Sequence, residues 1–380
     1  MKADRASSEQ NLKPAKSSQR PAWNEAAIWM GASLPALLGL YRRHRWAIEP
    51  RYWLDAAIDL GFATINSGLG GFVETVWGGR SVAPPIVAPL FILGHWRTGT
   101  TWLHELLSCD PQLRCPTTYE CFVPHHFLLT QRWVQRWARF AIPRTRSVDQ
   151  VTVGWDRPQE DEFALLNLGI PGPYARLAFP NQAEEDDRWL DLEQLGELEQ
   201  RRWRTTWLWF LRHLLAARAG QLCLKSPPHT CRVPTILELF PDSRFIYLVR
   251  NPSEVIPSTI RLWSSLSQVY GYQRGDPQRW RTEVPQMFAH FHQRFEATRA
   301  RIPADRLLVV HYEELIADPL DTLKRLYDGL KLGDFAQIQE RVISLVKSRS
   351  SYQRNQHGAD SDLQVAIRDS VRDYEQCHGY

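Results

Sequence analysis

Short apolar runs alternate with amphipathic stretches over most of the chain. The apolar runs cover 89–93, 222–224, 245–249 and 307–310. The segments that follow them repeat apolar residues at helical spacing. Short buried strands that alternate with helices form a parallel sheet covered on both faces. The pattern therefore predicts a three-layer α/β fold with a central parallel sheet flanked by helices.

Several helix boundaries are marked by capping residues. Ser253 has the position of a helix cap, because apolar residues at helical spacing follow it. Asp318 and Pro319 stand where the cap and the first residue of a helix are expected. Ligands bind at the carboxyl ends of parallel strands. The segments in which to look for a site are therefore 94–101, 225–232, 250–258 and 311–314.

The N-terminal part of the chain has a different pattern. Residues 1–22 are polar and predict a disordered tail. Residues 23–84 predict a helical lead-in, and the main domain is expected over 85–380.

The most apolar stretch of the lead-in, 26–41, allows two interpretations. It is shorter than the about 20 residues that span a bilayer, and Pro35 interrupts it. Three arginines follow at positions 42, 43 and 45. The stretch is either a helix packed on the domain or, over 26–45, a helix in peripheral contact with a membrane and with its arginines at the headgroups.

Composition narrows the choice of partners. The net charge of +4 is too small to indicate nucleic acid, and it fits a local basic site for an anionic ligand. The six cysteines have no paired metal-ligand spacing, so reduced thiols and no metal site are expected. The polar first residues contain no secretory signal, which predicts a cytoplasmic protein. The peripheral alternative for 26–45 places that contact on the inner membrane face.

One junction carries most of the chemical information. The apolar run 89–93 leads into a loop with two glycines, and a helical pattern follows at once. A strand, a loop and a helix in that order cradle an anion between the loop amides and the helix N-terminus. Thr100 stands at the position of the P-loop lysine, and Arg97 supplies the cation instead. The expected anion-binding residues are Gly94, Arg97, Thr98, Gly99, Thr100 and Thr101.

A second anion site is expected at Arg250. This residue follows the run 245–249, where a P-loop ATPase usually has an aspartate that helps to hold magnesium. An arginine at that place binds an anion instead of a metal. Ser258 lies in the first turns of the following helix and can donate its hydroxyl to the same anion.

A third strand end also carries cationic groups. Lys225 directly follows the run 222–224, and His229 and Arg232 come after it within one short loop. Lys225 is expected in the site, while His229 and Arg232 are either site residues or structural hydrogen bonders. Together with Arg97, Lys225 can stabilise negative charge that develops during a transfer reaction.

These motifs resemble the sulfotransferase family. The segments that carry the resemblance are 94–101, 224–227, 247–252 with Ser258, and 311–315. The resemblance runs from roughly residue 85 to the C-terminus and implies a P-loop-like fold. It implies 3′-phosphoadenosine 5′-phosphosulfate (PAPS) as the sulfuryl donor and a hydroxyl group as the acceptor. It further implies that the first loop binds the 5′-phosphosulfate, and that Arg250 and Ser258 bind the 3′-phosphate. The late segment 351–355 resembles a basic loop that closes over the nucleotide, so Arg354 is a further candidate for the 3′-phosphate.

The general base is less clear from the sequence. Related enzymes often place a glutamate or histidine shortly after the helix of the first loop, and Glu120, His125 and His126 fall in that stretch. Glu120 is the first candidate, and His125 or His126 is the second. The acids at 160–162 are a further candidate. Acids favour the first turn of a helix, so an exposed helix start is expected there.

Other functions stay open. A P-loop kinase or NTPase, a nucleotide-binding module without catalysis, and a protein that mainly attaches to a membrane surface are the alternatives. The acceptor is also open among sugar, lipid, phenol and protein tyrosine. The sixteen tryptophans would suit an acceptor with an apolar or sugar-ring face.

Overall fold

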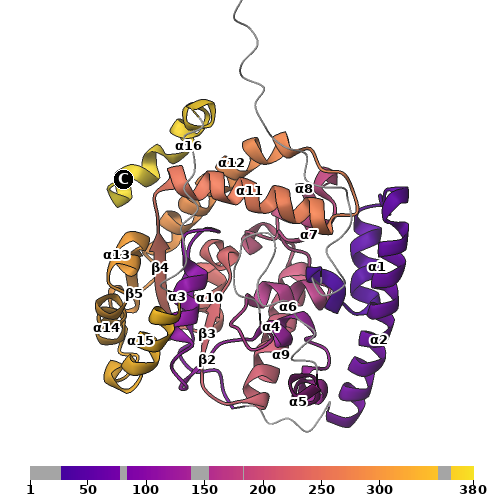
Figure 1. The fold of residues 1–380 in the computed structure, drawn as a ribbon, viewed down its shortest axis with the longest axis horizontal. Coiled ribbons are helices and arrows are strands. Elements are labelled where there is room, and N and C mark those ends of the chain that lie inside the picture. Colours follow the sequence, from indigo (N-terminus) through magenta and orange to yellow (C-terminus); the bar gives the residue numbers. More distant parts are fainter. Residues whose placement is uncertain (1–26, 78–83, 138–153, 183, 350–360) are drawn as a thin grey trace, which may run out of the picture.

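A five-stranded parallel sheet forms the centre of the molecule. The computed structural model describes residues 27–77, 84–137, 154–182, 184–349 and 361–380. In these residues the strand order is β2-β3-β1-β4-β5, and every neighbouring pair is parallel (Figure 1). The strands are β1 Leu90–Leu93, β2 Leu113–Arg114, β3 Gln221–Lys225, β4 Arg244–Val249 and β5 Leu307–His311. The predicted α/β fold is confirmed, and the four apolar runs correspond to β1, β3, β4 and β5.

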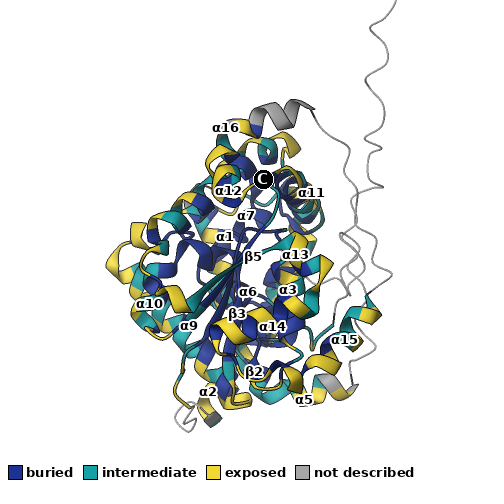
Figure 2. Ribbon diagram, turned by 90° about the vertical axis from the view of Figure 1, so that its left-hand side faces the viewer, coloured by how far each residue is buried: buried dark blue, intermediate teal, exposed yellow. Residues whose placement is uncertain are grey.

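Helices cover both faces of this sheet, and Figure 2 shows the buried strands between helices whose exposed faces point outward. The α-helices of the described residues are α1 Leu34–Arg43, α2 Trp53–Trp77, α3 Thr100–Leu107, α4 Thr118–Phe122, α5 Phe127–Trp137, α6 Asp161–Asn167, α7 Ala175–Ala178, α8 Glu184–Asp187, α9 Glu197–Ala217, α10 Val233–Leu239, α11 Pro252–Tyr270, α12 Pro277–Arg299, α13 Tyr312–Ala317, α14 Pro319–Leu330, α15 Gln339–Ser348 and α16 Ser361–His378.

Alternation along the strands produces two separate hydrophobic layers. In β1, Leu90 and Ile92 belong to a cluster with the apolar residues of α3, α14 and α15. Phe91 and Leu93 belong to a larger cluster that includes residues of α9, α11 and α12. All four side chains are fully buried. The strand between the two layers therefore ends with its backbone held from both sides, which makes it a rigid base for the loop that follows.

Two helix starts test the predicted caps. The cap of α11 is Asn251, whose side chain accepts a 2.9 Å hydrogen bond from the Ser253 backbone amide, so the predicted cap at Ser253 was wrong by two residues. Pro252 explains the difference, because proline is favoured at the first helical position. Asp318 caps α14 by accepting from the Asp321 amide at 3.0 Å, and Pro319 comes first in the helix, as predicted.

The N-terminal lead-in packs on the domain through a short 3₁₀ turn, η1 Ile28–Gly31, and through α1. Trp29 and Tyr41 are buried in the larger cluster, and the Tyr41 hydroxyl donates to the Tyr272 hydroxyl at 3.0 Å. The buried residues of η1 and α1 thus attach this part of the lead-in to the domain. Figure 1 shows α2 beside α1 at one edge of the molecule, and the exposed apolar residues of the lead-in lie mainly on α2.

Candidate active site

The loop between β1 and α3 has the backbone of an anion cradle. Gly94, Arg97 and Gly99 adopt left-handed conformations with φ of 142°, 69° and 99°. The Thr98 hydroxyl donates to the His95 carbonyl at 2.7 Å, and the Gly94 amide donates to the Thr230 hydroxyl at 2.8 Å. These bonds hold the turn that leads into Thr100 and Thr101 at the start of α3. The first amides of a helix have no partner within it and so can serve an anion.

Arg97 and Arg250, the cations of the two predicted anion sites, lie together. The Arg97 Nε donates to the Ser258 hydroxyl of α11 at 2.9 Å, and Arg250 donates to the Arg97 carbonyl at 3.0 Å. The Arg250 guanidinium lies over the Tyr312 ring, 4.1 Å from its centre, and also pairs with Glu254 one turn along α11. The structure therefore joins the ends of β1, β4 and β5 through arginine contacts.

Tyr374 of α16 contacts the same place from the other end of the chain. Its hydroxyl accepts a 3.0 Å bond from the Arg250 amide and lies 3.2 Å from the Arg250 carbonyl. Nothing in the local sequence around Tyr374 marks it, since the signal is a contact between segments 124 positions apart. Arg354, by contrast, lies outside the described residues, so its predicted place at the 3′-phosphate stays a prediction.

Lys225 and Glu160 form a buried ion pair beside the loop. The Lys225 ammonium lies 2.6 Å from a Glu160 oxygen and 3.4 Å from the Thr101 hydroxyl of α3. Tyr174 donates its hydroxyl to the second Glu160 oxygen, and the Trp96 indole donates to Tyr174 at 2.7 Å. Burial, and then the neighbouring Glu160, raise the pKa of Tyr174 well above its usual value, so this phenol stays protonated. Lys225 is thus placed next to the loop together with a carboxylate.

The acids at 160–162 are buried, so the expected exposed helix start was wrong. Asp161 is fully buried and accepts hydrogen bonds from Ser226, Trp207 and His229. Burial alone would raise the pKa of Asp161, but the His229 ring and these hydrogen bonds hold it below its usual range. Buried carboxylates persist only when paired. His229 therefore anchors α6 on the turn after β3.

Arg232 anchors the next acid, Glu162, as His229 anchors Asp161. It forms a two-pronged pair with Glu162, at 2.6 and 3.0 Å, and also donates to the Trp189 carbonyl. Both partners are buried. The three acids thus fix the start of α6 against the end of β3, and this fixed contact is what brings Glu160 to Lys225.

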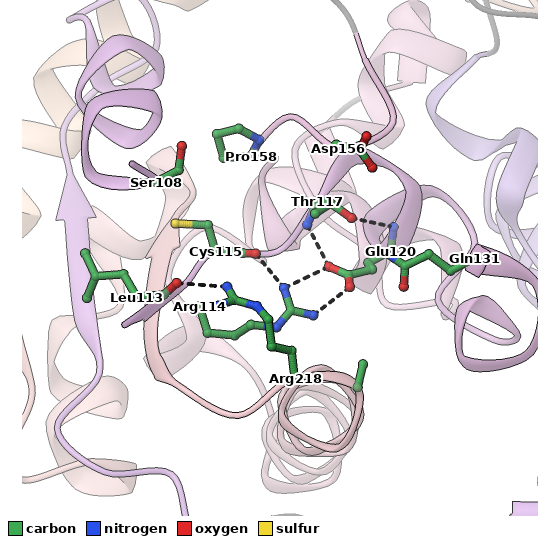
Figure 3. A pocket seen from close by; sticks show the side chains of 11 residues that line it. Ser108, Leu113, Arg114, Cys115, Thr117, Glu120, Gln131, Asp156, Pro158 and Arg218 are labelled. Carbon is green, nitrogen blue, oxygen red and sulfur yellow. Dashed lines mark hydrogen bonds and ion pairs between the residues drawn. The ribbon is translucent and has the colours of Figure 1, made fainter. Parts of the chain in front are cut away.

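Glu120 has a different environment from the one expected of a base. Its carboxylate forms a two-pronged pair with Arg114 at 2.6 and 3.1 Å and accepts from the Thr117 amide at 2.8 Å in a capping box (Figure 3). These groups line a cavity of about 260 Å³, which Arg218 also borders. Arg114 and Arg218 are further bonded to backbone carbonyls. The contacts of Glu120 therefore hold α4 and β2 together.

The two histidines after α4 also have structural partners. His125 Nε2 lies 3.0 Å from the Asn167 carbonyl at the end of α6, and His126 lies 3.1 Å from Asn66 of α2 and 2.9 Å from Thr130. Burial lowers the pKa of His125 and lowers that of His126 to about 4. Both rings are thus neutral near pH 7, and they tie α2 and α6 to the start of α5.

Two clusters of metal-ligand types occur among the described residues. His104, Cys115 and Cys223 form the first, and a hydrogen bond with Cys223 lowers the pKa of Cys115 to about 5. His292, Glu296 and His378 form the second, between α12 and α16. Neither cluster includes a residue of the loop 94–101 or the Lys225–Glu160 pair.

Comparison with known proteins decides the family. A sequence model described as the sulfotransferase family matches residues 89–336, which is more than half of the chain. The chain belongs to the sulfotransferase family. This sulfotransferase is 34% identical over 374 residues to an omega-hydroxy-beta-dihydromenaquinone-9 sulfotransferase of Mycobacterium bovis, and the match covers 97% of this chain and 96% of that protein. A Mycobacterium tuberculosis protein of the same name matches equally.

Solved structures support the same fold. A sulfotransferase of Mycobacterium avium superposes with a TM-score of 0.65 at 20% identity, over 91% of this chain and 96% of that one. A sulfotransferase of Mycobacterium tuberculosis gives 0.56 at 19% identity, over 84% and 90%. The P-loop-like fold predicted for this sulfotransferase is therefore confirmed, and the kinase or NTPase alternative is not favoured.

Proposed function

We propose that this sulfotransferase moves a sulfuryl group from PAPS to a hydroxyl group of a lipid-like acceptor. The observation that carries the donor assignment is the contact of Arg97 with Ser258, and of Arg250 with the Arg97 carbonyl, at 2.9 and 3.0 Å. PAPS has anionic groups at two separate places, and two linked arginines at neighbouring strand ends match them. In the proposed complex the loop 94–101 holds the 5′-phosphosulfate, and Arg250 with Ser258 holds the 3′-phosphate.

The proposed reaction is a displacement at sulfur. The acceptor oxygen bonds to sulfur, and the bond between sulfur and the bridging oxygen of the 5′-phosphate breaks. The proton of the acceptor hydroxyl goes to the general base. The products are a sulfate ester and 3′-phosphoadenosine 5′-phosphate. Arg97 and Lys225 stabilise the charge that grows on the bridging oxygen, and losing one such donor typically costs about 3 kcal/mol.

We assign the base to Glu160 rather than to Glu120 or His125. Glu160 lies against Lys225, which in turn lies 3.4 Å from Thr101 of the loop helix. A base must be within hydrogen-bond reach of the proton that it removes. The contacts of Glu120 with Arg114 and of His125 with Asn167 satisfy those two groups elsewhere. An acceptor hydroxyl that takes the place of the Tyr174 hydroxyl would lie within hydrogen-bond reach of Glu160.

Calorimetric titration with 3′-phosphoadenosine 5′-phosphate in the presence of EDTA tests the donor site. We expect binding without a metal, and we expect Arg250→Ala to weaken it by about 10- to 100-fold, since a charge-assisted hydrogen bond contributes about 1.5–3 kcal/mol. Arg301→Ala is the matched control, because Arg301 is an exposed arginine of the turn after α12. Binding of ATP with magnesium alone would overturn the donor assignment and favour a kinase.

The lipid-like acceptor rests on the mycobacterial relative. The name of that relative gives a hydroxylated menaquinone as its substrate, and the match covers nearly the full length of both chains. A second relative, a putative protein-tyrosine sulfotransferase, is 31% identical over only 118 residues, 30% of this chain. The longer match favours a hydroxylated prenyl lipid over protein tyrosine.

Transfer of ³⁵S from labelled PAPS to three acceptors separates these classes. The acceptors are a detergent-solubilised hydroxylated prenyl quinone, a tyrosine peptide with acidic neighbours, and a mixture of free sugars. We expect label in the organic extract at a rate at least about tenfold above the other two, because an extended apolar acceptor gains binding energy from each buried methylene. Faster labelling of the peptide or the sugars would contradict the acceptor class and leave the donor assignment intact.

A further inference from the structure

Exposed apolar side chains are concentrated in one part of the lead-in. Of the eleven large hydrophobic side chains that are exposed among the described residues, eight lie between positions 38 and 72. Six of these are on α2, namely Trp53, Leu54, Ile58, Phe62, Ile65 and Phe72. Contiguous exposed apolar surface marks a site of contact with an apolar partner.

The polarity of α2 is reversed relative to a helix of a water-soluble domain. Three of its polar residues, Asp59, Asn66 and Ser67, are bonded to the protein. Asp59 is buried and accepts from the Tyr272 hydroxyl at 2.5 Å. Asn66 donates to the carbonyls of Met30 and Ala32, and Ser67 accepts from the Leu34 amide at 2.7 Å. A soluble helix buries its apolar side and exposes its polar one. Here the side with Asp59, Asn66 and Ser67 faces the domain, and the outward side, with its exposed apolar residues, suits an apolar medium.

The outward face has no charge along most of its length. From Trp53 to Phe72 the exposed positions hold only apolar residues, glycine and threonine. This stretch of twenty residues is about 30 Å long. The helix over Pro50–Val76 is long and apolar enough to cross a membrane by length and composition. Its most apolar 18-residue window has a mean hydropathy of 1.2, and only 28% of that window is buried.

Basic and aromatic residues stand at the N-terminal end of this face. Arg42, Arg45 and Arg51 are exposed there, and so are the indole rings of Trp46 and Trp53. Arginine attracts anionic lipid headgroups, and tryptophan prefers the boundary between headgroups and acyl chains. The bonds of Asp59 and Asn66 to the domain keep α2 from leaving it, so a position across the bilayer is excluded and a position in its surface is left.

We propose that the outward face of α2 lies flat in the surface of an anionic bilayer, with Arg42, Arg45 and Arg51 against lipid phosphates. This moves the apolar part of the membrane contact expected for 26–45 to the next helix, since Trp29, Leu37, Leu40 and Tyr41 are buried in the core.

The position of α2 relative to Glu160 connects the proposed membrane contact with the proposed reaction. A methyl group added at Gly70 of α2 would lie 3.0 Å from His125, which bonds the Asn167 carbonyl at the end of α6. Glu160 precedes the first residue of the same helix. With seven residues, α6 is about 10 Å long. If the proposed function holds, a lipid acceptor whose hydroxyl enters from the bilayer has about one short helix to pass before it reaches Glu160.

Vesicle flotation tests the membrane contact without donor or acceptor. The full chain is mixed with vesicles of three parts phosphatidylcholine and one part phosphatidylglycerol, and separately with phosphatidylcholine alone. We expect wild type to float with the anionic vesicles, and the triple variant Ile58→Gln, Phe62→Gln, Ile65→Gln to lose at least about tenfold in affinity. Leu198→Gln is the matched control, because Leu198 of α9 is 81% exposed and lies outside the α2 face. The variant Arg42→Gln, Arg45→Gln, Arg51→Gln should bind the anionic vesicles more weakly than wild type. Its behaviour with vesicles of phosphatidylcholine alone should equal that of wild type.

Sedimentation of the lipid-free protein tests the alternative that a second copy of the chain, rather than a bilayer, binds the outward face of α2. The small residues Gly61, Gly68 and Gly71 on the outward face would also allow close packing of two α2 helices. A wild-type dimer that the triple variant converts to a monomer would overturn the proposal, and so would wild type that stays in the lipid-free fraction. Thermal melting of each variant shows whether it is folded. If wild type fails to float but still binds 3′-phosphoadenosine 5′-phosphate, the membrane proposal is wrong and the donor assignment stands.

Discussion

Glu160→Gln should reduce kcat by about 10²- to 10⁴-fold, the range that a general base contributes. Glutamine keeps the size and the hydrogen-bonding shape of the side chain but cannot take a proton. Because Lys225 and the donor loop keep their positions, binding of 3′-phosphoadenosine 5′-phosphate should change little. Steady-state rates with labelled donor, together with calorimetry, measure both quantities.

Glu120→Gln is the informative comparison for that experiment. It should leave kcat within a few-fold of wild type and lower thermal stability, since it removes one charge from the buried pair with Arg114. The pH dependence separates a base from a residue that only positions Lys225. Loss of a base removes the fall of kcat toward acidic pH. A large loss in Glu120→Gln with normal stability, and near-normal kcat in Glu160→Gln, would return the base to Glu120.

Gly99→Ala should abolish donor binding at accessible concentrations, a loss of at least about 100-fold. At φ of 99° a side chain is strained, at a cost of about 1–3 kcal/mol. The added methyl group would also lie 2.3 Å from Cδ2 of Tyr312. Relief of that clash moves Tyr312, on which Arg250 is stacked, so both proposed anion sites are disturbed together.

Titration with 3′-phosphoadenosine 5′-phosphate and a thermal melt measure the Gly99→Ala effect. Gly39→Ala is the matched control, because Gly39 lies in α1 with open space around the added methyl group. It should bind like wild type and be equally or slightly more stable, since alanine favours a helix. Wild-type affinity in Gly99→Ala would mean that the loop relaxes, and it would contradict the rigid cradle described above.

The fold and the donor loop were accessible from the sequence because their signals are local. A run such as 245–249 is apolar on both faces, and the parallel sheet follows from its alternation with helices. Glycines and arginines at the ends of these runs then meet, because parallel strands end at one edge. Strand β2, with only Leu113 and Arg114, was missed since two residues carry no period.

The acid partner of Lys225 could not be found in the same way. The acids 160–162 look like the first turn of an exposed helix, and that local preference is real, because they do begin α6. Their burial comes from Ser226, His229 and Arg232, which the sheet delivers from more than 60 positions away. Tyr374 at Arg250 is a similar long-range contact.

The apolar face of α2 shows another limit of sequence patterns. Hydropathy drew attention to 26–41, where Trp29, Leu37, Leu40 and Tyr41 are buried in the core and Leu38 is the exposed large hydrophobic residue of the described part. A window average does not say which side of a helix is attached to the domain. On α2 that was decided by three polar residues, Asp59, Asn66 and Ser67, and by their partners elsewhere in the chain.

The strand order has a consequence for the time at which the donor loop forms during folding. Strand β1 pairs with two strands that come far later in the chain, since Leu90 is opposite Cys223 on one side and Arg244 on the other. Contacts of such large sequence separation form slowly, because a long loop must close first. The loop after β1 therefore has its final shape only when the middle three strands have assembled. Nucleotide binding during refolding would then report the late step of sheet closure rather than the early formation of helices.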